Sequence, residues 1–507
     1  MNNNLPSDLL NLLLAHGPER PVIGAPGRQD MTRGELVNLT GRVASALSGI
    51  GVQQQDTVAI VMPNGPEMTA LFIAVASSAV AAPLNSAYRD EEFDFYLGDL
   101  NAKAVIMTEG VESPVRVVAA RRGIPVIELR AEAGRPAGTF SLSVPMSDAA
   151  LPKPSAADIA LVLHTSGTTS RPKIVPLSHA NLTASAANIA ATLALTPHDR
   201  SLVIMPMFHI HGLVGAILSS VSAGASLFCP PGFNALKFFG WLEEARATWY
   251  TAVPTMHQTI LARASRNSDI VDSMRLRFIR SSSASLPRQV MAELESVFGC
   301  PVIESYGMTE AAHQMASNPL PPRSRKPGSV GLAAGPEVAI MGADGQLLPR
   351  RMTGEVVIRG SNVTRGYANN PEANAKAFVK GWFLTGDQGV LDEEGYLTLT
   401  GRLKEIINRG GEKISPLEVD EVLLDHPAVA QAVTFAMPHD KLGEEVAAAV
   451  VLHEGQSADE SSLREFAARK LADFKVPRKL LILSEIPKGP TGKIQRIGLA
   501  GRLGLSA

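Results

Sequence analysis

Residues 159–173 read IALVLHTSGTTSRPK, an apolar run followed by a loop of small polar residues. The first five residues have the continuous apolar pattern of a strand that is buried on both faces. The loop then brings six consecutive hydroxyl-bearing or glycine residues and ends in Lys173, so backbone N–H groups, hydroxyls and a positive charge are available to a polyphosphate. The Walker A pattern is absent. A flexible surface loop is the alternative, but the position directly after a buried strand favours phosphate binding.

Strands of the same kind are predicted on both sides of this stretch, at Val58–Met62, Ala104–Met107 and Leu202–Met205, with longer helical patterns between them. Continuous apolar strands that alternate with helices form parallel sheets covered on both faces, so the predicted fold class is α/β. From about Val338 the pattern changes to half-exposed strands between Gly-rich turns, which predicts a small β-rich subdomain.

Charge density divides the chain near Gly401. Residues 401–507 hold 30 charged side chains in 107 positions, whereas the first 400 residues hold 66. A small domain has more surface per residue than a large one, so this rise predicts a large N-terminal domain at 1–400 and a separate C-terminal domain at 401–507.

The composition excludes several classes of protein. The 507 residues include 47 basic and 49 acidic side chains, a balance that argues against nucleic-acid binding through bulk charge. Two cysteines, Cys229 and Cys300, exclude a disulfide scaffold and a four-cysteine zinc site. The apolar stretches Met68–Leu84 and Gly212–Phe228 contain Ser, and Ala or Gly is frequent in them, so we expect buried helices and not membrane spans. With neither a signal-peptide pattern nor a peroxisomal Ser-Lys-Leu ending, a cytoplasmic protein without a membrane partner is expected.

A second group of motifs fits a nucleotide. In Ser305–Glu310 (SYGMTE), Tyr306 suits stacking on a base, Thr309 a phosphate contact and Glu310 a metal. The alternative for this segment is a helix that begins with Thr309 as its N-cap. In Gly381–Asp387 (GWFLTGD), the carboxylate of Asp387 on a glycine turn suits a ribose diol; the alternative is an Asx-turn with a salt bridge.

Three short Gly- and Lys-containing segments lie in the charged C-terminal region: Gly401–Lys404 (GRLK), Asn408–Ser415 (NRGGEKIS), which reads as a hairpin-like turn, and Pro487–Ile494 (PKGPTGKI). Each of these motifs alone is weak evidence for a function. Together with Pro206–His209 (PMFH), in this order and spacing, they resemble the adenylate-forming superfamily of acyl-CoA synthetases, adenylation domains and firefly-type luciferases over nearly the whole chain.

This resemblance implies a large ATP- and acid-binding domain followed by a small, mobile α+β domain. In the first half-reaction a carboxylate attacks the α-phosphate of ATP and expels pyrophosphate, and in the second half-reaction the thiol of CoA takes the acyl group. The resemblance implies ATP, Mg²⁺ and CoA as cofactors, with Glu310 as the metal ligand and four residues with catalytic roles, namely Lys493, Thr309, Glu310 and His209. It implies that ATP or AMP is bound by Thr165, Ser166, Gly167, Thr168, Thr169, Lys173, Ser283, Ala284, Glu304, Ser305, Tyr306, Gly307, Met308, Asp387 and Arg402.

For the second half-reaction, the resemblance aligns Lys404 with the hinge about which the small domain rotates, and it implies that the loop at Gly410 and Gly411 borders the pantetheine tunnel. One position departs from the family pattern. Ile174 stands where family loops usually have glycine, and a β-branched residue does not readily take a positive φ. Either the loop is shifted, with an effect on ATP binding, or its glycine never needed a positive φ.

Residues expected to line the acid pocket are polar, whereas a fatty or aryl acid favours an apolar lining. Histidines and serines near Arg280 suit a second carboxylate, although each histidine has the alternative of pairing only with its neighbours. The strings at 164–173, 249–255, 280–286 and 408–416 resemble oxalate–CoA ligases of plants and fungi, which implies oxalate as the acid. The residues assigned to the acid are His211, Arg280, Ser281, Ser282 and His313.

Three alternatives remain at this point: a CoA ligase for another small or medium acid, a stand-alone enzyme that loads a carrier protein, and a non-catalytic binder of acid or nucleotide. The short chain after Lys493 argues against a fused carrier domain and favours free CoA. Ile174 is the feature that favours a non-catalytic binder. The sequence does not indicate an oligomeric state.

Overall fold

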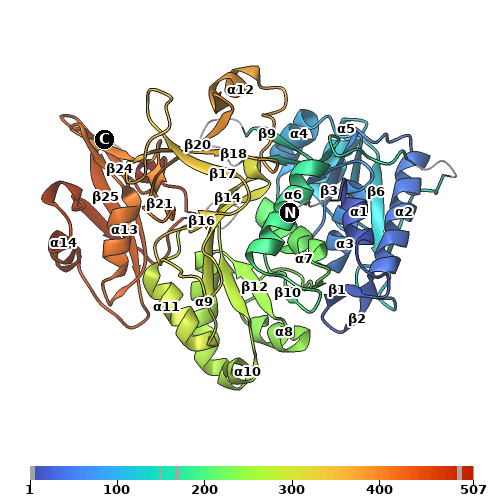
Figure 1. Cartoon of the computed structure of the whole chain (residues 1–507), viewed down its shortest axis with the longest axis horizontal. Coiled ribbons are helices and arrows are strands. Elements are labelled where there is room, and N and C mark those ends of the chain that lie inside the picture. Colours follow the sequence, from blue (N-terminus) through green and yellow to red (C-terminus); the bar gives the residue numbers. More distant parts are fainter. Residues whose placement is uncertain (1–5, 148–150, 166–171, 488–493, 506–507) are drawn as a thin grey trace.

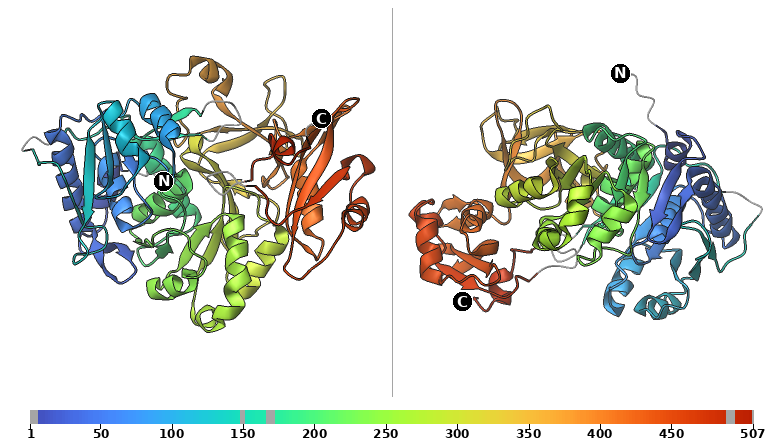
Figure 2. Two further views of the ribbon diagram at one scale, coloured as in Figure 1. Left: turned by 180° about the vertical axis from the view of Figure 1, so that it is seen from behind. Right: turned by 90° about the horizontal axis from the view of Figure 1, so that it is seen from below.

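The protein is described by a computed structural model that covers residues 6–147, 151–165, 172–487 and 494–505. The described residues form four β-sheets. In each of the three ribbon views the blue-to-teal seven-stranded sheet and the red C-terminal elements lie at opposite ends of the molecule, with the green and yellow elements between them (Figures 1 and 2).

The seven-stranded sheet has a parallel centre and one antiparallel strand at each edge. Its order is β7 (Phe140–Leu142), β6 (Val126–Ala131), β5 (Ala104–Thr108), β3 (Thr57–Val61), β4 (Val80–Pro83), β8 (Ile159–His164) and β9 (Ile174–Ser178). Val58 and Ile60 of β3 face one apolar layer, while Ala59 and Val61 face a second layer. This double burial explains the continuous apolar strand patterns.

The nine-stranded sheet repeats this plan. Its order is β16 (Leu332–Ala333), β15 (His313–Ser317), β14 (Val302–Met308), β13 (Phe278–Ser281), β12 (Trp249–Ala252), β10 (Arg200–Leu202), β11 (Ser226–Phe228), β1 (Pro21–Ala25) and β2 (Arg28–Thr32). The six strands from β14 to β1 run parallel. Trp249 and Phe278 face the layer shared with the other sheet, whereas Tyr250 and Ile279 face the outer helices.

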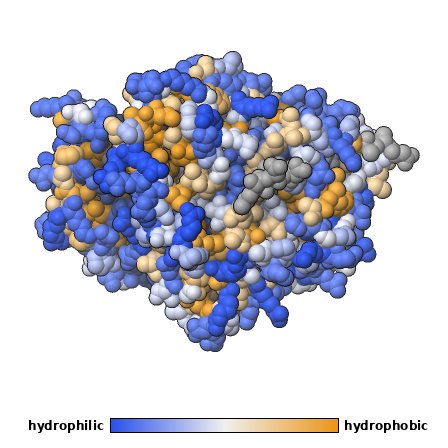
Figure 3. Space-filling model, in the orientation of Figure 1, coloured by the Kyte–Doolittle hydropathy of each residue, from blue (hydrophilic) through white to orange (hydrophobic). Residues whose placement is uncertain are grey.

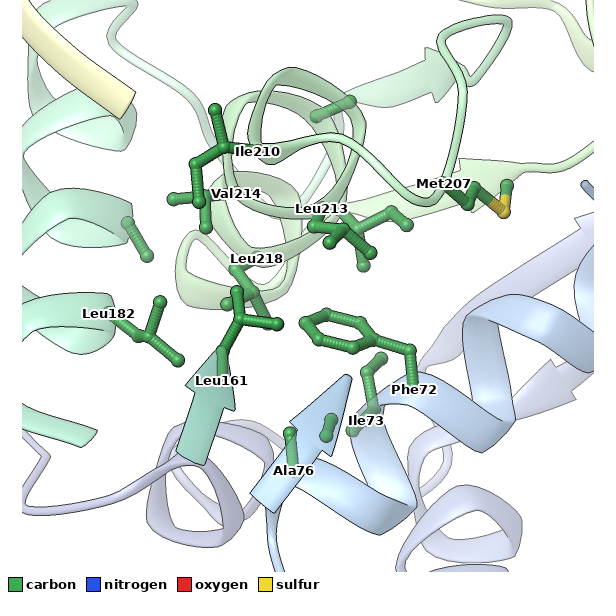
Figure 4. Packing of buried hydrophobic residues seen from close by; sticks show 14 of the residues in the cluster. Phe72, Ile73, Ala76, Leu161, Leu182, Met207, Ile210, Leu213, Val214 and Leu218 are labelled. Carbon is green, nitrogen blue, oxygen red and sulfur yellow. The ribbon is translucent and has the colours of Figure 1, made fainter. Parts of the chain in front are cut away.

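The helices cover the sheets and fill the space between them. They are α1 (Leu9–Leu14), α2 (Arg33–Gly49), α3 (Pro66–Ala76), α4 (Asp90–Asp99), α5 (Pro114–Arg121), α6 (His179–Thr192), the π-helix η1 (His211–Leu218), α7 (Ser219–Ser222), α8 (Phe238–Ala245), α9 (Pro254–Ala264), α10 (Ser268–Ser273), α11 (Arg288–Phe298), α12 (Pro371–Ala377), α13 (Pro416–Leu424), α14 (Glu460–Ala468) and α15 (Leu499–Arg502). Phe72 of α3, Leu161 of β8, Leu182 of α6 and Leu213 of η1 meet in one buried cluster (Figure 4). The two large sheets therefore share a single core.

Two smaller sheets follow along the chain. The first is antiparallel and contains β17 (Glu337–Met341), β18 (Gly354–Arg359), β19 (Phe378–Val379), β20 (Trp382–Leu391) and β21 (Leu397–Arg402). The second contains β22 (Ile407–Arg409), β23 (Glu412–Ile414), β24 (Val429–His439), β25 (Gly443–Leu452) and β26 (Lys479–Ile482). Two apolar clusters pack against the second sheet, and all of their described residues lie at or after Ile407.

The predicted α/β class with a β-rich subdomain is confirmed, and several element boundaries are corrected. Met68–Leu84 is not one helix, because α3 ends at Ala76 and the chain continues as β4. Gly212–Phe228 likewise divides into η1, α7 and strand β11. The strand predicted at Leu202–Met205 ends at Leu202. Apolar content alone cannot separate a buried helix from a buried strand.

No helix among the described residues is long and apolar enough to cross a membrane. On the face shown in Figure 3, hydrophilic residues surround apolar patches, which gather most clearly to the left of the centre. The apolar clusters of the core lie inside the sheets and helices.

Candidate active site

The end of β14 brings together the residues predicted to hold adenine and ribose. Tyr306 is buried, and its hydroxyl donates a hydrogen bond to Oδ2 of Asp387 on β20. Asp387 lies opposite Arg402 in the β20–β21 ladder, and Arg402 Nε is 3.2 Å from Asp387 Oδ1. Burial and the Asp387 carboxylate raise the pKa of Tyr306 well above its ordinary value, so its hydroxyl stays a donor. The salt bridge in the alternative interpretation of Asp387 is present, but Asp387 lies within a strand.

Glu310 lies in a three-residue 3₁₀ turn, Thr309–Ala311, directly after β14. Thr309 is therefore not the N-cap of a helix, and that alternative is wrong, because strand β15 follows the turn. Glu310 is buried, its Oε1 accepts a 2.9 Å hydrogen bond from the Tyr367 hydroxyl, and burial raises the pKa of its carboxyl group. Lys173 Nζ lies 4.4 Å from the centre of the Tyr367 ring. Tyr367 thus contacts a carboxylate through its hydroxyl and a cation through its ring.

The described ends of the phosphate loop are held by strands β8 and β9. Thr165 N donates to Lys173 O at 2.9 Å, and Lys173 N donates to Thr165 Oγ1 at 3.3 Å. Ser166, Gly167, Thr168 and Thr169 lie outside the described residues, as does Lys493.

Ile174 is the first residue of β9, where it pairs with His164, and its side chain is buried beside Val162. It is not among the residues with positive φ. Of the two explanations for the missing glycine, the structure favours the one in which this position never needed a positive φ.

The histidines assigned to the acid lie against each other at the start of η1. The rings of His211 and His313 meet edge to face, with 4.9 Å between their centres. His211 is fully buried, with Nδ1 3.0 Å from Ser283 Oγ and Nε2 2.6 Å from Thr251 Oγ1. A Cβ atom on Gly215 would lie 2.5 Å from the His313 ring, so only glycine leaves room for this pair.

Arg280 lies beside this histidine pair on β13, and none of its surface is exposed. Its Nη1 is 3.5 Å from His313 Nε2, and its Nη2 donates to Gln314 Oε1 at 3.1 Å. Burial lowers the pKa of Arg280 to about 9. Because arginine only donates, His313 Nε2 can take part in this contact only as the acceptor.

The serines assigned to the acid have different surroundings. The Ser281 hydroxyl is buried and has no hydrogen-bond partner among the described residues. The Ser282 hydroxyl instead donates to Ser305 O at 3.0 Å, and the Ser305 hydroxyl donates to Ser281 O at 3.3 Å. By strand alternation Ser281 lies on the face of β13 opposite to Arg280, together with Ile279 and beside Ala252 of β12.

The remaining residues assigned to ATP flank β14. Glu304 is buried, its Oε1 accepts a 2.9 Å bond from Leu286 N, and burial raises its pKa to about 8. Gly307 and Met308 end the strand, and a Cβ atom on Gly307 would lie 2.0 Å from His313 O. Ala284 is exposed. His209 lies just before η1, and its carbonyl accepts from Leu213 N at 3.1 Å.

The C-terminal residues assigned to CoA lie at turns. Lys404 is exposed two residues after the end of β21, and Gly410 and Gly411 form the turn of the β22–β23 hairpin with φ values of 58° and 99°. The predicted hairpin is therefore present. Nearby, Arg496 connects Asp420 of α13 to Glu405.

Two residues at the site were not assigned to it from the sequence, namely Gln314 and Tyr367. On the neighbouring strand β12, Trp249 and Tyr250 point into the two apolar layers, whereas Thr251 contacts His211. The alternation of side chains along a strand indicates this orientation in the sequence, because residues two positions apart lie on the same face of the sheet. No local pattern links Tyr367 to Glu310. Among the described residues no group of three or more His, Cys, Asp or Glu side chains forms a metal cluster.

Comparison with known proteins adds three findings. The family model described as AMP-binding enzyme matches residues 14–368, and the model for the AMP-binding enzyme C-terminal domain matches residues 418–493. The chain is 47% identical to a probable CoA ligase, CCL9, of Humulus lupulus and 45% identical to an oxalate–CoA ligase of Arabidopsis thaliana, with 98% of this chain and 96% and 98% of those proteins covered. The crystal structure of ATP-bound MatB from Rhodopseudomonas palustris superimposes with a TM-score of 0.89 at 31% identity, over 98% of each chain.

Proposed function

The chain belongs to the AMP-binding enzyme family as an ATP-dependent acid–CoA ligase, and we propose that its acid is oxalate. The observation that carries the choice of acid is the buried guanidinium of Arg280 beside His313 and His211, in a setting without a carboxylate partner among the described residues. Such a site favours an acid that carries a second negative charge. The identity with an oxalate–CoA ligase of Arabidopsis thaliana supports the same choice.

In the first half-reaction an oxalate oxygen attacks the α-phosphorus of ATP, the bond to the β-phosphate oxygen breaks, and pyrophosphate leaves. Tyr306 stacks on adenine, while Asp387 and Arg402 bind the ribose. Thr309 and His209 contact the α-phosphate and the acid, and Lys173, the phosphate loop and Lys493 stabilise charge on the phosphates. Catalysis in this step is mainly positioning and electrostatic stabilisation.

Glu310 suits the Mg²⁺ that accompanies ATP. Magnesium is usually held by one or two carboxylates together with phosphate oxygens and water, so the single carboxylate of Glu310 is a sufficient protein contribution. The Tyr367 hydroxyl orients this carboxylate through Oε1. A bound cation would supply charge neutralisation on the phosphates and would keep Glu310 ionised against the effect of its burial.

In the second half-reaction the CoA sulfur attacks the oxalyl carbonyl carbon and AMP leaves. We place the domain boundary at residue 401, with rotation near Lys404 that brings Gly410 and Gly411 to the thiol path. The separate apolar clusters of the C-terminal sheet support this division. The cytoplasmic location stays a prediction from the sequence.

The test is pyrophosphate release with ATP, CoA and a panel of acids: oxalate, malonate, glycolate, acetate, octanoate and 4-coumarate. Oxalate is expected to give the highest kcat/KM, with oxalyl-CoA and AMP as products. A preference for octanoate or 4-coumarate would refute the choice of acid. Transfer to a carrier protein but not to CoA would identify a carrier-loading enzyme, and no AMP with any acid would identify a non-catalytic binder.

A further inference from the structure

Arg280 is a buried cation whose contacts are all neutral. It forms no ion pair with a described residue, and its Nε has no hydrogen-bond partner among them. Its other two nitrogens contact the imidazole of His313 and the amide oxygen of Gln314. A buried charge without a counter-ion is costly, so this arrangement needs an explanation beyond packing.

Two other arginines with little exposed surface have different partners, although Nε and Nη1 of Arg33 also lack a hydrogen-bond partner among the described residues. Arg496 forms ion pairs with Asp420 and Glu405. Arg33 donates to the carbonyls of Val221 and Ala225, around the C-terminal end of α7, where the helix carries partial negative charge. Neither kind of compensation is present at Arg280.

Two hydrogen bonds fix the Gln314 amide in the orientation that presents its neutral oxygen to Arg280. Its Nε2 donates to Thr192 Oγ1 at 3.1 Å and to Ala334 O at 3.0 Å. Because both acceptors lie on the side of Nε2, the oxygen Oε1 must face Arg280. Gln314 thus positions the guanidinium without cancelling its charge.

We propose that Gln314 is a specificity-determining positioning residue: its neutral amide holds Arg280 next to His313 and leaves the full positive charge to the second carboxylate of the substrate. A carboxylate at position 314 would form an ion pair with Arg280 and neutralise it, and the enzyme would lose its preference for a doubly charged acid. This inference rests on the proposed function, since it assumes that a dicarboxylic acid binds beside His211 and His313.

The test compares oxalate with glycolate, which has a similar size but one negative charge. Gln314→Glu is expected to lower kcat/KM for oxalate about 100-fold, mainly through KM, while glycolate changes less than about threefold. Gln314→Met is the matched neutral control; it removes the hydrogen bond that positions Arg280 but adds no charge, so it is expected to lower the ratio of oxalate to glycolate by about 3- to 10-fold, well short of the effect of Gln314→Glu. Thermal unfolding and the KM for ATP report whether each variant keeps its fold.

An unchanged oxalate-to-glycolate ratio in Gln314→Glu would overturn the proposal, and so would an equal shift of the ratio in Gln314→Met. If Gln314→Glu does not fold, Arg280→Met is the second test. It removes the positive charge of Arg280 itself, so it must reduce the preference for oxalate by a similar factor. Failure of the proposed function is a separate result, because wild-type enzyme would then release no pyrophosphate with oxalate. In that case the ratio of malonate to acetate is measured with the same variants and judged by the same criteria.

Discussion

Glu304 allows a stability prediction with a definite sign. Its side chain is buried, Oε1 accepts from Leu286 N, and Oε2 has no hydrogen-bond partner among the described residues. Burial raises its pKa to about 8 from 4.5, an effect to which Glu421 adds and which Leu286 N and Arg288 oppose. Between these two values the folded chain binds a proton that the unfolded chain has lost, so stability falls as the pH rises.

The expected loss follows from the two pKa values. Between pH 6 and pH 8 the folded state gives up about half of its bound proton, and integration of the linkage relation gives a loss of about 2 kcal/mol from Glu304 alone. An amide side chain cannot titrate, so the Glu304→Gln variant lacks this contribution. At pH 6 the variant is expected to be less stable than wild type by about 1 kcal/mol, because the new amide NH₂ has no acceptor. At pH 8 the order is expected to reverse.

The assay is thermal and urea-induced unfolding of wild type and Glu304→Gln at pH 6, 7 and 8 in one buffer of constant ionic strength. The measured quantity is the difference in midpoint between the two proteins at each pH. A difference that does not change with pH would refute the raised pKa of Glu304. A variant that becomes relatively less stable as the pH rises would refute the sign.

Three further predictions concern the reaction. Lys404→Pro is expected to spare pyrophosphate release and to impair thioester formation, because it stiffens the chain at the proposed hinge; equal loss in both assays would contradict this. His313→Ala is expected to raise KM for oxalate far more than KM for ATP, and a similar rise for both would argue against its contact with the acid. Ile174→Gly is expected to lower the unfolding midpoint without faster pyrophosphate release, since it removes a buried side chain from β9, at a cost of about 2–4 kcal/mol; a faster rate would show that the loop needs the glycine.

Much of the fold follows from local pattern. The strands at 58–62, 104–107 and 159–163 were predictable because both faces of these strands are buried, which leaves an apolar residue at every position. The division of Met68–Leu84 into α3 and β4 was not predictable from hydropathy, because helix and strand are equally apolar there. Pairing with β3 decides that Val80–Pro83 is a strand, and pairing is a tertiary property.

The same limit applies to the site. Motifs pointed to Tyr306, Asp387 and Arg402, and the structure brings these three together through the β20–β21 ladder. Tyr367 was missed because its link to Glu310 depends on how a loop 57 residues later folds back. Gln314 was missed because glutamine is common on surfaces, and its meaning here comes only from the buried cation it faces.

The topology of the nine-stranded sheet has a consequence for synthesis of the chain. Strand β1 pairs on one side with β2, which follows it directly in the chain. Its partner on the other side is β11, whose residues 226–228 are synthesised about two hundred positions later. At about 5–20 residues per second, the ribosome needs roughly 10–40 s to supply that partner. Val22 and Ile23 are fully buried in the finished protein. Throughout this interval they lie on a strand whose second neighbour, β11, has not yet been made. The nascent hairpin therefore presents an unpaired apolar strand edge for tens of seconds, a feature that favours aggregation until the partner strand is made.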